Sequence, residues 1–129
     1  MSEIKAVVSG NAPAAIGPYS QAITVNNMVY TSGVIPLDPE TKEIDGNDIT
    51  TQARRVLTSL KALLEDAGSS LDNVVKTTCF LQDLNDFATF NEIYGSFFTG
   101  DTVPARSAVQ VAKLPMGVLI EVEAVATLK

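Results

Sequence analysis

The strongest constraint on the fold is a pair of short β-branched and aromatic runs separated by two asparagines. Residues 22–25 read Ala-Ile-Thr-Val and residues 28–31 read Met-Val-Tyr-Thr, with Asn26 and Asn27 between them. Asparagine tolerates the positive φ angles that a two-residue hairpin turn needs at both central positions. The pattern therefore predicts an antiparallel hairpin over 22–31.

An amphipathic helix is predicted after a loop at 35–47 that is rich in Pro, Asp, Gly and Thr. From Asp48 to Ala67, apolar residues recur at helical spacing, and Gly68 follows where a helix commonly ends in a left-handed residue. This length corresponds to about five helical turns. Charged residues fall on the opposite face, where solvent exposure is expected: Arg54, Arg55, Lys61 and Glu65.

A second helix is predicted with Asn85 as its N-cap. Its aromatic residues lie on or beside one apolar stripe: Phe87, Phe90, Tyr94, Phe97 and Phe98. Asn91 interrupts that stripe. Because a buried amide needs a hydrogen-bond partner, Asn91 either pins a neighbouring loop or helps to line a site.

Three further runs predict strands, at 73–82, 105–112 and 118–128, and a short strand is expected within 4–9. The resulting order, β-β-α-β-α-β-β after the short strand, favours an α+β fold in which two helices cover one face of a mixed, six-stranded sheet. The strands carry apolar residues on both faces. The face without helices should therefore be covered in an oligomer.

Composition limits the class of protein. The chain has 129 residues, of which 46% are hydrophobic and 19% charged, which predicts one domain over 1–129 with a single core. The beginning of the chain has no basic region followed by a long apolar stretch, so a cytoplasmic protein without a membrane segment is expected. The net charge of -6 argues against binding to a nucleic-acid backbone. The lone cysteine, Cys79, lies within an apolar strand and is interpreted as a small hydrophobic residue.

The absence of histidine restricts the chemistry most. It excludes Ser-His-Asp and Cys-His catalysis, zinc sites built on histidine and the iron site of two histidines and one carboxylate. Any reaction must therefore use carboxylate, arginine, tyrosine, hydroxyl groups, backbone groups or water.

Two charged residues are candidates for a site. Arg106 lies near the start of a small, apolar strand, where it is either part of a structural salt bridge or a bidentate clamp for a small carboxylate ligand. Glu121 is flanked by Ile120 and Val122 and either pairs with Arg106 or holds a catalytic water. Glu123, on the same face of the strand, competes for either role.

Two loop segments add further candidates. Gly17 and Pro18 precede Tyr19 and fix the direction of its phenol, although a turn with a packed tyrosine explains the same pattern. Gly33 follows Ser32 at the end of the predicted hairpin, where a glycine lets a ligand approach backbone N–H groups closely.

With these segments assembled, the chain resembles the RidA (YjgF) family, whose members are also labelled endoribonuclease L-PSP or translation initiation inhibitors. The matching stretches span essentially the whole chain: APAAIGPYSQ (12–21), VYTSGVIPLDPETKEI (29–44), DLNDFATFNEIY (83–94), PARSAVQVAKLP (104–115) and IEVEAVA (120–126). Several of them fall in predicted loops, which resemblance of fold alone would not reproduce.

The resemblance implies a chorismate-mutase-like protomer that forms a homotrimer around a sheet-lined barrel, with ligand clefts at the subunit interfaces. It also implies a 2-iminobutanoate/2-iminopropanoate deaminase. Such an enzyme hydrolyses 2-aminoacrylate, 2-aminocrotonate and related imines to 2-keto acids and ammonia. These compounds are released by pyridoxal-phosphate enzymes such as threonine or serine dehydratase, and the hydrolysis requires no cofactor.

The resemblance assigns three catalytic roles. Arg106 would grip the substrate carboxylate, and Glu121 would position or activate the attacking water. Tyr19 would pack against the substrate from across the interface. An imine is already electrophilic, so orientation and one carboxylate can supply much of the acceleration without histidine.

The resemblance also assigns the wall of the pocket. Backbone groups around Gly33 and Ala108 would donate to the carboxylate, and Ser32 and Asn91 would shape the wall. Many relatives have cysteine in place of Ala108 and glutamine in place of Val34, so activities that depend on that thiol are not expected here.

Two other functions compete with the deaminase. A ribonuclease or inhibitor of translation conflicts with the acidic charge and the absence of histidine. A non-catalytic sensor that binds a keto acid or amino acid and regulates a partner would use the same arginine equally well.

Overall fold

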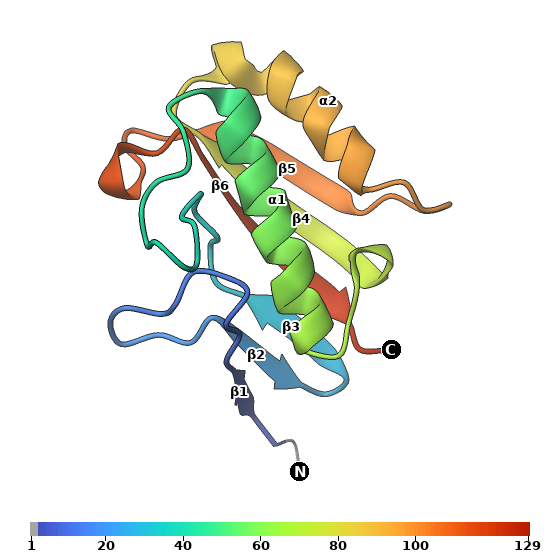
Figure 1. Ribbon diagram of the computed structural model, residues 1–129. Helices are drawn as coiled ribbons and strands as arrows, with labels where there is room; N and C mark the ends of the chain where they lie inside the picture. Colours follow the sequence, from blue (N-terminus) through green and yellow to red (C-terminus); the bar gives the residue numbers. More distant parts are fainter. Residues whose placement is uncertain (1–2) are drawn as a thin grey trace.

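The computed structural model describes residues 3–129 and has one six-stranded sheet in the order β1-β2-β3-β6-β4-β5. Helices α1 and α2 cover one face of this sheet, as Figure 1 shows. The elements are β1 (Lys5–Val7), β2 (Ala22–Val25), β3 (Met28–Thr31), α1 (Ile49–Asp66), β4 (Val74–Leu81), α2 (Phe87–Phe97), β5 (Ala105–Gln110) and β6 (Ile120–Thr127). The α+β prediction, with a mixed sheet and two helices on one face, is confirmed.

The hairpin forms as predicted. Val25 pairs with Met28, and the two turn residues, Asn26 and Asn27, have φ angles of 50° and 63°. The sheet is mixed because β4 pairs in parallel with β5, whereas β6 is antiparallel to both of its neighbours, β3 and β4.

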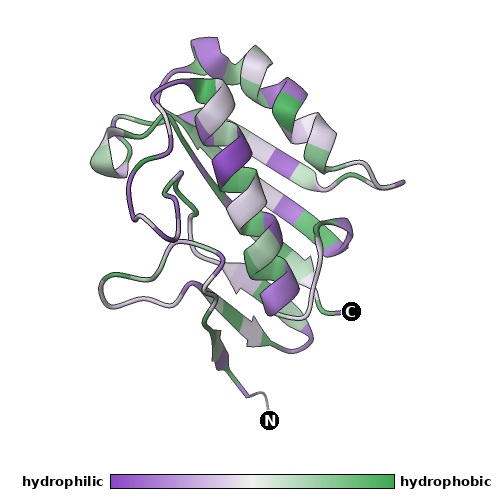
Figure 2. Cartoon of the chain, viewed as in Figure 1, coloured by the Kyte–Doolittle hydropathy of each residue, from purple (hydrophilic) through white to green (hydrophobic). Residues whose placement is uncertain are grey.

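Helix α1 begins and ends where the sequence indicates. The Asp48 carboxylate accepts a hydrogen bond from the Thr51 backbone N–H at 2.9 Å and so caps the first turn. Gly68 follows the helix with a φ of +91°. Hydrophilic and hydrophobic residues alternate along α1 (Figure 2), and its buried apolar residues are Ala53, Val56, Leu57, Leu60, Leu63 and Leu64.

One charged residue of α1 does not face solvent as predicted. Arg55 is half-buried and forms ion pairs with Asp45 at 2.9 Å and with Asp38 at 3.4 Å. These contacts tie the 35–47 loop to the helix, and Leu37 and Ile44 form a β-bridge within that loop. The loop is therefore ordered by long-range pairing rather than by any periodicity of its own.

The start of α2 differs from the prediction. Asn85 lies in a short 3-10 turn and donates its backbone N–H to the Asp83 carboxylate at 2.8 Å, and α2 begins at Phe87. Asn85 is therefore not the N-cap. Asn91 is exposed rather than buried, so the prediction of a buried amide in the aromatic stripe is wrong.

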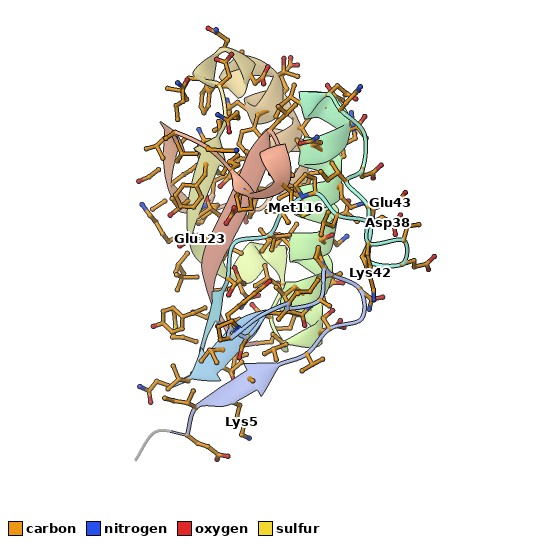
Figure 3. All side chains as sticks on the ribbon, turned by 90° about the vertical axis from the view of Figure 1, so that its left-hand side faces the viewer. Lys5, Asp38, Lys42, Glu43, Met116 and Glu123 are labelled. Atoms are coloured by element: carbon orange, nitrogen blue, oxygen red, sulfur yellow. The ribbon has the colours of Figure 1, made fainter. Side chains whose placement is uncertain are left out.

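The two faces of β6 differ sharply. Its even-numbered residues are buried beneath the helices, whereas Glu121, Glu123 and Val125 lie on the face that no helix covers. Figure 3 shows Glu123 on the side of the sheet away from α1. We call this surface the open face. It mixes charged with apolar groups, including Tyr30 and Val109, which are 45% and 43% exposed.

No helix within residues 3–129 combines the length and the apolar character needed to cross a lipid bilayer.

Candidate functional site

Arg106 rests on helix α2. Its guanidinium carbon lies 4.7 Å from the ring centroid of Tyr94 and 5.3 Å from that of Phe87. Its Nη1 donates a hydrogen bond of 2.6 Å to Oδ1 of Asn91. Two aromatic faces and one amide oxygen therefore hold the guanidinium in place.

The partners of Arg106 are all neutral. Within residues 3–129 the structure shows no carboxylate paired with Arg106, so the structural salt bridge considered from the sequence is not present in this chain. The positive charge therefore remains available to an anionic ligand, and the guanidinium keeps N–H donors beyond the one given to Asn91. Asn91 thus contacts the candidate residue Arg106, and no hydrogen bond from its side chain to a loop is found within residues 3–129.

The spacing of residues in the sequence carries a signal for this arrangement. Phe87, Asn91 and Tyr94 are spaced by four and three residues, so they lie on one stripe of α2. Asn91 interrupts the aromatic stripe at the point where the Arg106 guanidinium lies against the helix.

The pairing between β6 and the chain that follows β3 contains a bulge close to Glu121. Tyr30 pairs with Val125 and Val34 with Val122, so four steps along one strand face three along the other. The extra residue lies near Ser32 and Gly33. Bulges of this kind re-aim side chains and occur next to active sites.

Glu121 lies directly over Gly33. A Cβ atom added to Gly33 would overlap the Glu121 carboxyl group, with Cδ only 2.7 Å away. Burial raises the pKa of Glu121, and the charge of nearby Glu123 raises it further. A carboxyl group with a raised pKa is suited to accept a proton from water near neutral pH.

Substituting Gly33 with alanine should displace the Glu121 carboxyl group, to which the resemblance assigns the attacking water. We expect kcat to fall by about tenfold, because a shift of about 1 Å in such a group has large effects on rate. Gly10→Ala is the matched control, since a Cβ there meets no atom within 4 Å. Steady-state kinetics and thermal melting of both variants test this. Full activity in Gly33→Ala would show that the position of Glu121 over Gly33 has no role in catalysis.

Tyr19, Ser32 and Gly33 line a cavity of about 270 Å³. Tyr19 is 51% exposed at its rim, and the Ser32 hydroxyl donates to the Ser20 carbonyl at 2.7 Å. This hydrogen bond ties the loop that contains Ser20 to the end of the hairpin. The cavity wall is mainly apolar and includes Ala12, Pro13, Ile16, Val34, Leu37, Leu63 and Met116.

Arg106 and Glu121 lie on opposite faces of the sheet. Arg106 pairs with Thr77 of β4, and Glu121 pairs with Phe80 of the same strand. Side chains alternate along a strand, so residues three positions apart point to opposite faces. The candidate residues on the two faces therefore form two groups, which we call the arginine half-site (Arg106, Asn91 and Ala108) and the glutamate half-site (Glu121 and Gly33). Tyr19 and Ser32 line the cavity that Gly33 also borders.

Ala108 faces the same side as Arg106, where it pairs with Cys79 across β4 and β5. Burial raises the pKa of the Cys79 thiol to about 11, so it is protonated at neutral pH and behaves as a small apolar residue.

Residues 3–129 contain no cluster of three or more histidine, cysteine, aspartate or glutamate residues that could hold a metal ion.

Comparison with known proteins gives consistent matches over most of the chain. The model of the family described as endoribonuclease L-PSP matches residues 9–128. The 2-iminobutanoate/2-iminopropanoate deaminase of Escherichia coli K12 is 52% identical over 124 residues, which are 95% of this chain and 96% of that protein.

Two crystal structures from E. coli show the same fold. The YjgF gene product has a TM-score of 0.92 and 50% identity, covering 97% of this chain and 99% of that one. TdcF with bound serine has a TM-score of 0.91 and 47% identity, also covering 97% and 99%. By sequence and by structure, this chain belongs to the RidA (YjgF) family, which the matching model describes as endoribonuclease L-PSP.

Proposed function

We propose that this chain is a 2-iminobutanoate/2-iminopropanoate deaminase that hydrolyses reactive 2-imino and 2-enamino acids to 2-keto acids and ammonia. The observation that carries the proposal is the arginine half-site, whose cation has only neutral partners, in a chain 52% identical to a deaminase of that name. The serine bound to TdcF supports a small carboxylate as the ligand class. Pyridoxal-phosphate dehydratases would supply the substrate, and the hydrolysis needs no cofactor.

The proposed mechanism uses Arg106 and Glu121 in different steps. Arg106 binds the substrate carboxylate through two N–H donors and thereby fixes the position of the imine carbon. Glu121 accepts a proton from the water that attacks this carbon and returns it to the imine nitrogen, which gives a neutral carbinolamine. The carbinolamine hydroxyl then loses its proton to the nitrogen through the same carboxylate, the C–N bond breaks, and the keto acid and ammonia are released. Tyr19 packs against the bound substrate.

The mechanism requires two copies of the chain, because one chain holds the half-sites on opposite faces. We propose a homotrimer in which the open face is covered and the arginine half-site of one subunit meets the glutamate half-site of the next. The mixed surface around Tyr30 and Val109 supports such an interface. We also propose that residues 1–129 form one domain, which agrees with the single sheet that runs from β1 to β6.

Mixing two inactive variants tests the shared site. Arg106→Met and Glu121→Gln should each be inactive, but their trimers, unfolded and refolded together, should recover activity. A random equal mixture of closed three-fold rings restores about a quarter of the sites, because one interface in each mixed trimer has both residues intact. No recovery, in trimers that contain both variants by mass spectrometry, would contradict a site shared between subunits.

The activity itself is tested by release of 2-ketobutyrate from 2-iminobutanoate, which threonine dehydratase generates in situ. The wild-type protein should accelerate this release above the rate with buffer alone. If it binds 2-ketobutyrate but does not accelerate release, the protein is a sensor and not a deaminase. RNA binding that weakens with added salt would instead support the ribonuclease alternative.

A further inference from the structure

A buried hydrogen bond joins the sheet to helix α2 beneath Arg106. The hydroxyl of Thr77 on β4 lies 2.8 Å from the hydroxyl of Tyr94 on α2. Thr77 is fully buried, and it is the residue that pairs with Arg106 across the two parallel strands. The hydrogen bond thus lies beside the strand position from which the guanidinium extends.

The ring of Tyr94 is the nearer of the two aromatic faces that hold Arg106, at 4.7 Å. Phe98 stacks on this ring with centroids 4.5 Å apart and planes inclined by 30°, and Phe90 contacts it at 5.8 Å. The attraction between a cation and a ring depends on where the ring face lies. Whatever fixes the ring of Tyr94 therefore helps to fix the guanidinium.

The hydrogen bond is suited to this task. Tyr94 is 7% exposed, and burial raises the pKa of its phenol, which remains neutral in the pH range where a raised glutamate pKa would operate. A neutral phenol and a threonine hydroxyl can each donate to the other. Removing the Thr77 hydroxyl leaves the buried phenol of Tyr94 without this partner, so the pair favours the present orientation of the ring.

We propose that Thr77 and Tyr94 are positioning residues, whose buried hydrogen bond fixes the ring on which Arg106 is oriented toward the substrate carboxylate. The inference rests on the proposed function only for the identity of that carboxylate. The charge of Arg106 and its orientation then depend on different groups. The charge is supplied by the guanidinium, and the orientation by three neutral groups of α2, one of which is anchored to β4.

A direct test uses the Nε–H signal of Arg106 in NMR spectra of the wild-type protein. Arg54, Arg55 and Arg106 are the three arginines of the chain, so three single substitutions assign their signals. We expect the Arg106 signal to be shifted by the ring current of Tyr94 and to show restricted motion. Both properties should be reduced in Tyr94→Phe and in Thr77→Val, whereas the signals of Arg54 and Arg55 remain unchanged. An unchanged Arg106 signal in both variants would overturn the inference, whatever the protein catalyses.

A second test measures binding and kinetics in the same variants. We expect each single substitution to weaken 2-ketobutyrate binding and to raise KM by about tenfold, with kcat changed less, because the ligand carboxylate is held less well. The double variant should be no worse than either single variant, because both partners of one hydrogen bond are then absent.

The matched control is Ser69→Ala. The Ser69 hydroxyl lies in the turn after α1, is buried and donates to the Thr127 carbonyl at 2.6 Å. It should lower the melting temperature without changing KM. If Ser69→Ala and Tyr94→Phe change KM equally, the role of Tyr94 is only structural. If wild-type turnover is absent but Tyr94→Phe still alters the Arg106 signal, the proposed function fails and the positioning role stands.

Discussion

Replacing Arg106 with methionine should lower kcat/KM for 2-iminobutanoate by about three orders of magnitude, the scale of losing two charge-assisted hydrogen bonds. Methionine is flexible and apolar and can still cover the rings of Phe87 and Tyr94, so the fold and the proposed trimer should persist. The measurement is keto-acid release with coupled threonine dehydratase, together with molar mass in solution.

Two controls sharpen this result. Arg54→Met removes an exposed charge from α1 and should keep full activity. Arg106→Lys retains the positive charge but loses the planar fork of donors, so it should recover only part of the activity. Full turnover in Arg106→Met would exclude the proposed clamp.

Glu121→Gln should lower kcat by a factor of about 10² to 10⁴, the usual contribution of a general base, with little change in KM. In the wild type the acid limb of the pH profile of kcat should lie above the ordinary glutamate pKa of 4.5, because burial and Glu123 both raise the pKa of Glu121. Activity should fall as pH falls through that raised value. A Glu121→Gln variant that keeps the wild-type rate and pH profile would remove Glu121 from the mechanism.

The Glu123→Gln variant tests whether the acid limb of the pH profile reports the ionisation of Glu121. It removes a negative charge near Glu121, so the pKa of Glu121 should fall and the acid limb should move to lower pH. An acid limb that does not move would mean that the limb reports another group.

The same carboxyl group should reduce stability at neutral pH. The folded state raises the pKa of Glu121 and thus favours its protonated form. Its contribution to stability is present below the pKa of the unfolded chain and is lost as pH rises through the folded value. Glu121→Gln should therefore melt at a higher temperature than wild type at pH 7, and the difference should shrink toward pH 4.

The elements that the sequence predicted correctly depend on local interactions. The hairpin requires only two residues that tolerate positive φ, and α1 requires an amphipathic stripe between Asp48 and Gly68. Asn85 was assigned wrongly because Asp83, two residues earlier, captures its backbone N–H in a tighter turn. A short polar side chain can compete in this way with a regular helix cap.

The arrangement of the site depends on interactions between distant segments. Alternation predicted which residues of β5 share a face with Arg106, and which residues of β6 share a face with Glu121. It could not relate the two strands, because that relation passes through the register of β4 with both neighbours. The bulge at Ser32 and Gly33 was not predicted for the same reason, since it exists only relative to β6.

The placement of the half-sites on opposite faces has a genetic consequence. In the proposed trimer each subunit lends Arg106 to one cleft and Glu121 to another. If one subunit of a trimer has lost both residues but still assembles, two of the three clefts are inactive. Each of these two clefts still receives one intact residue from a wild-type subunit. Such an allele should be dominant over the wild-type copy, whereas an allele that abolishes folding should be recessive.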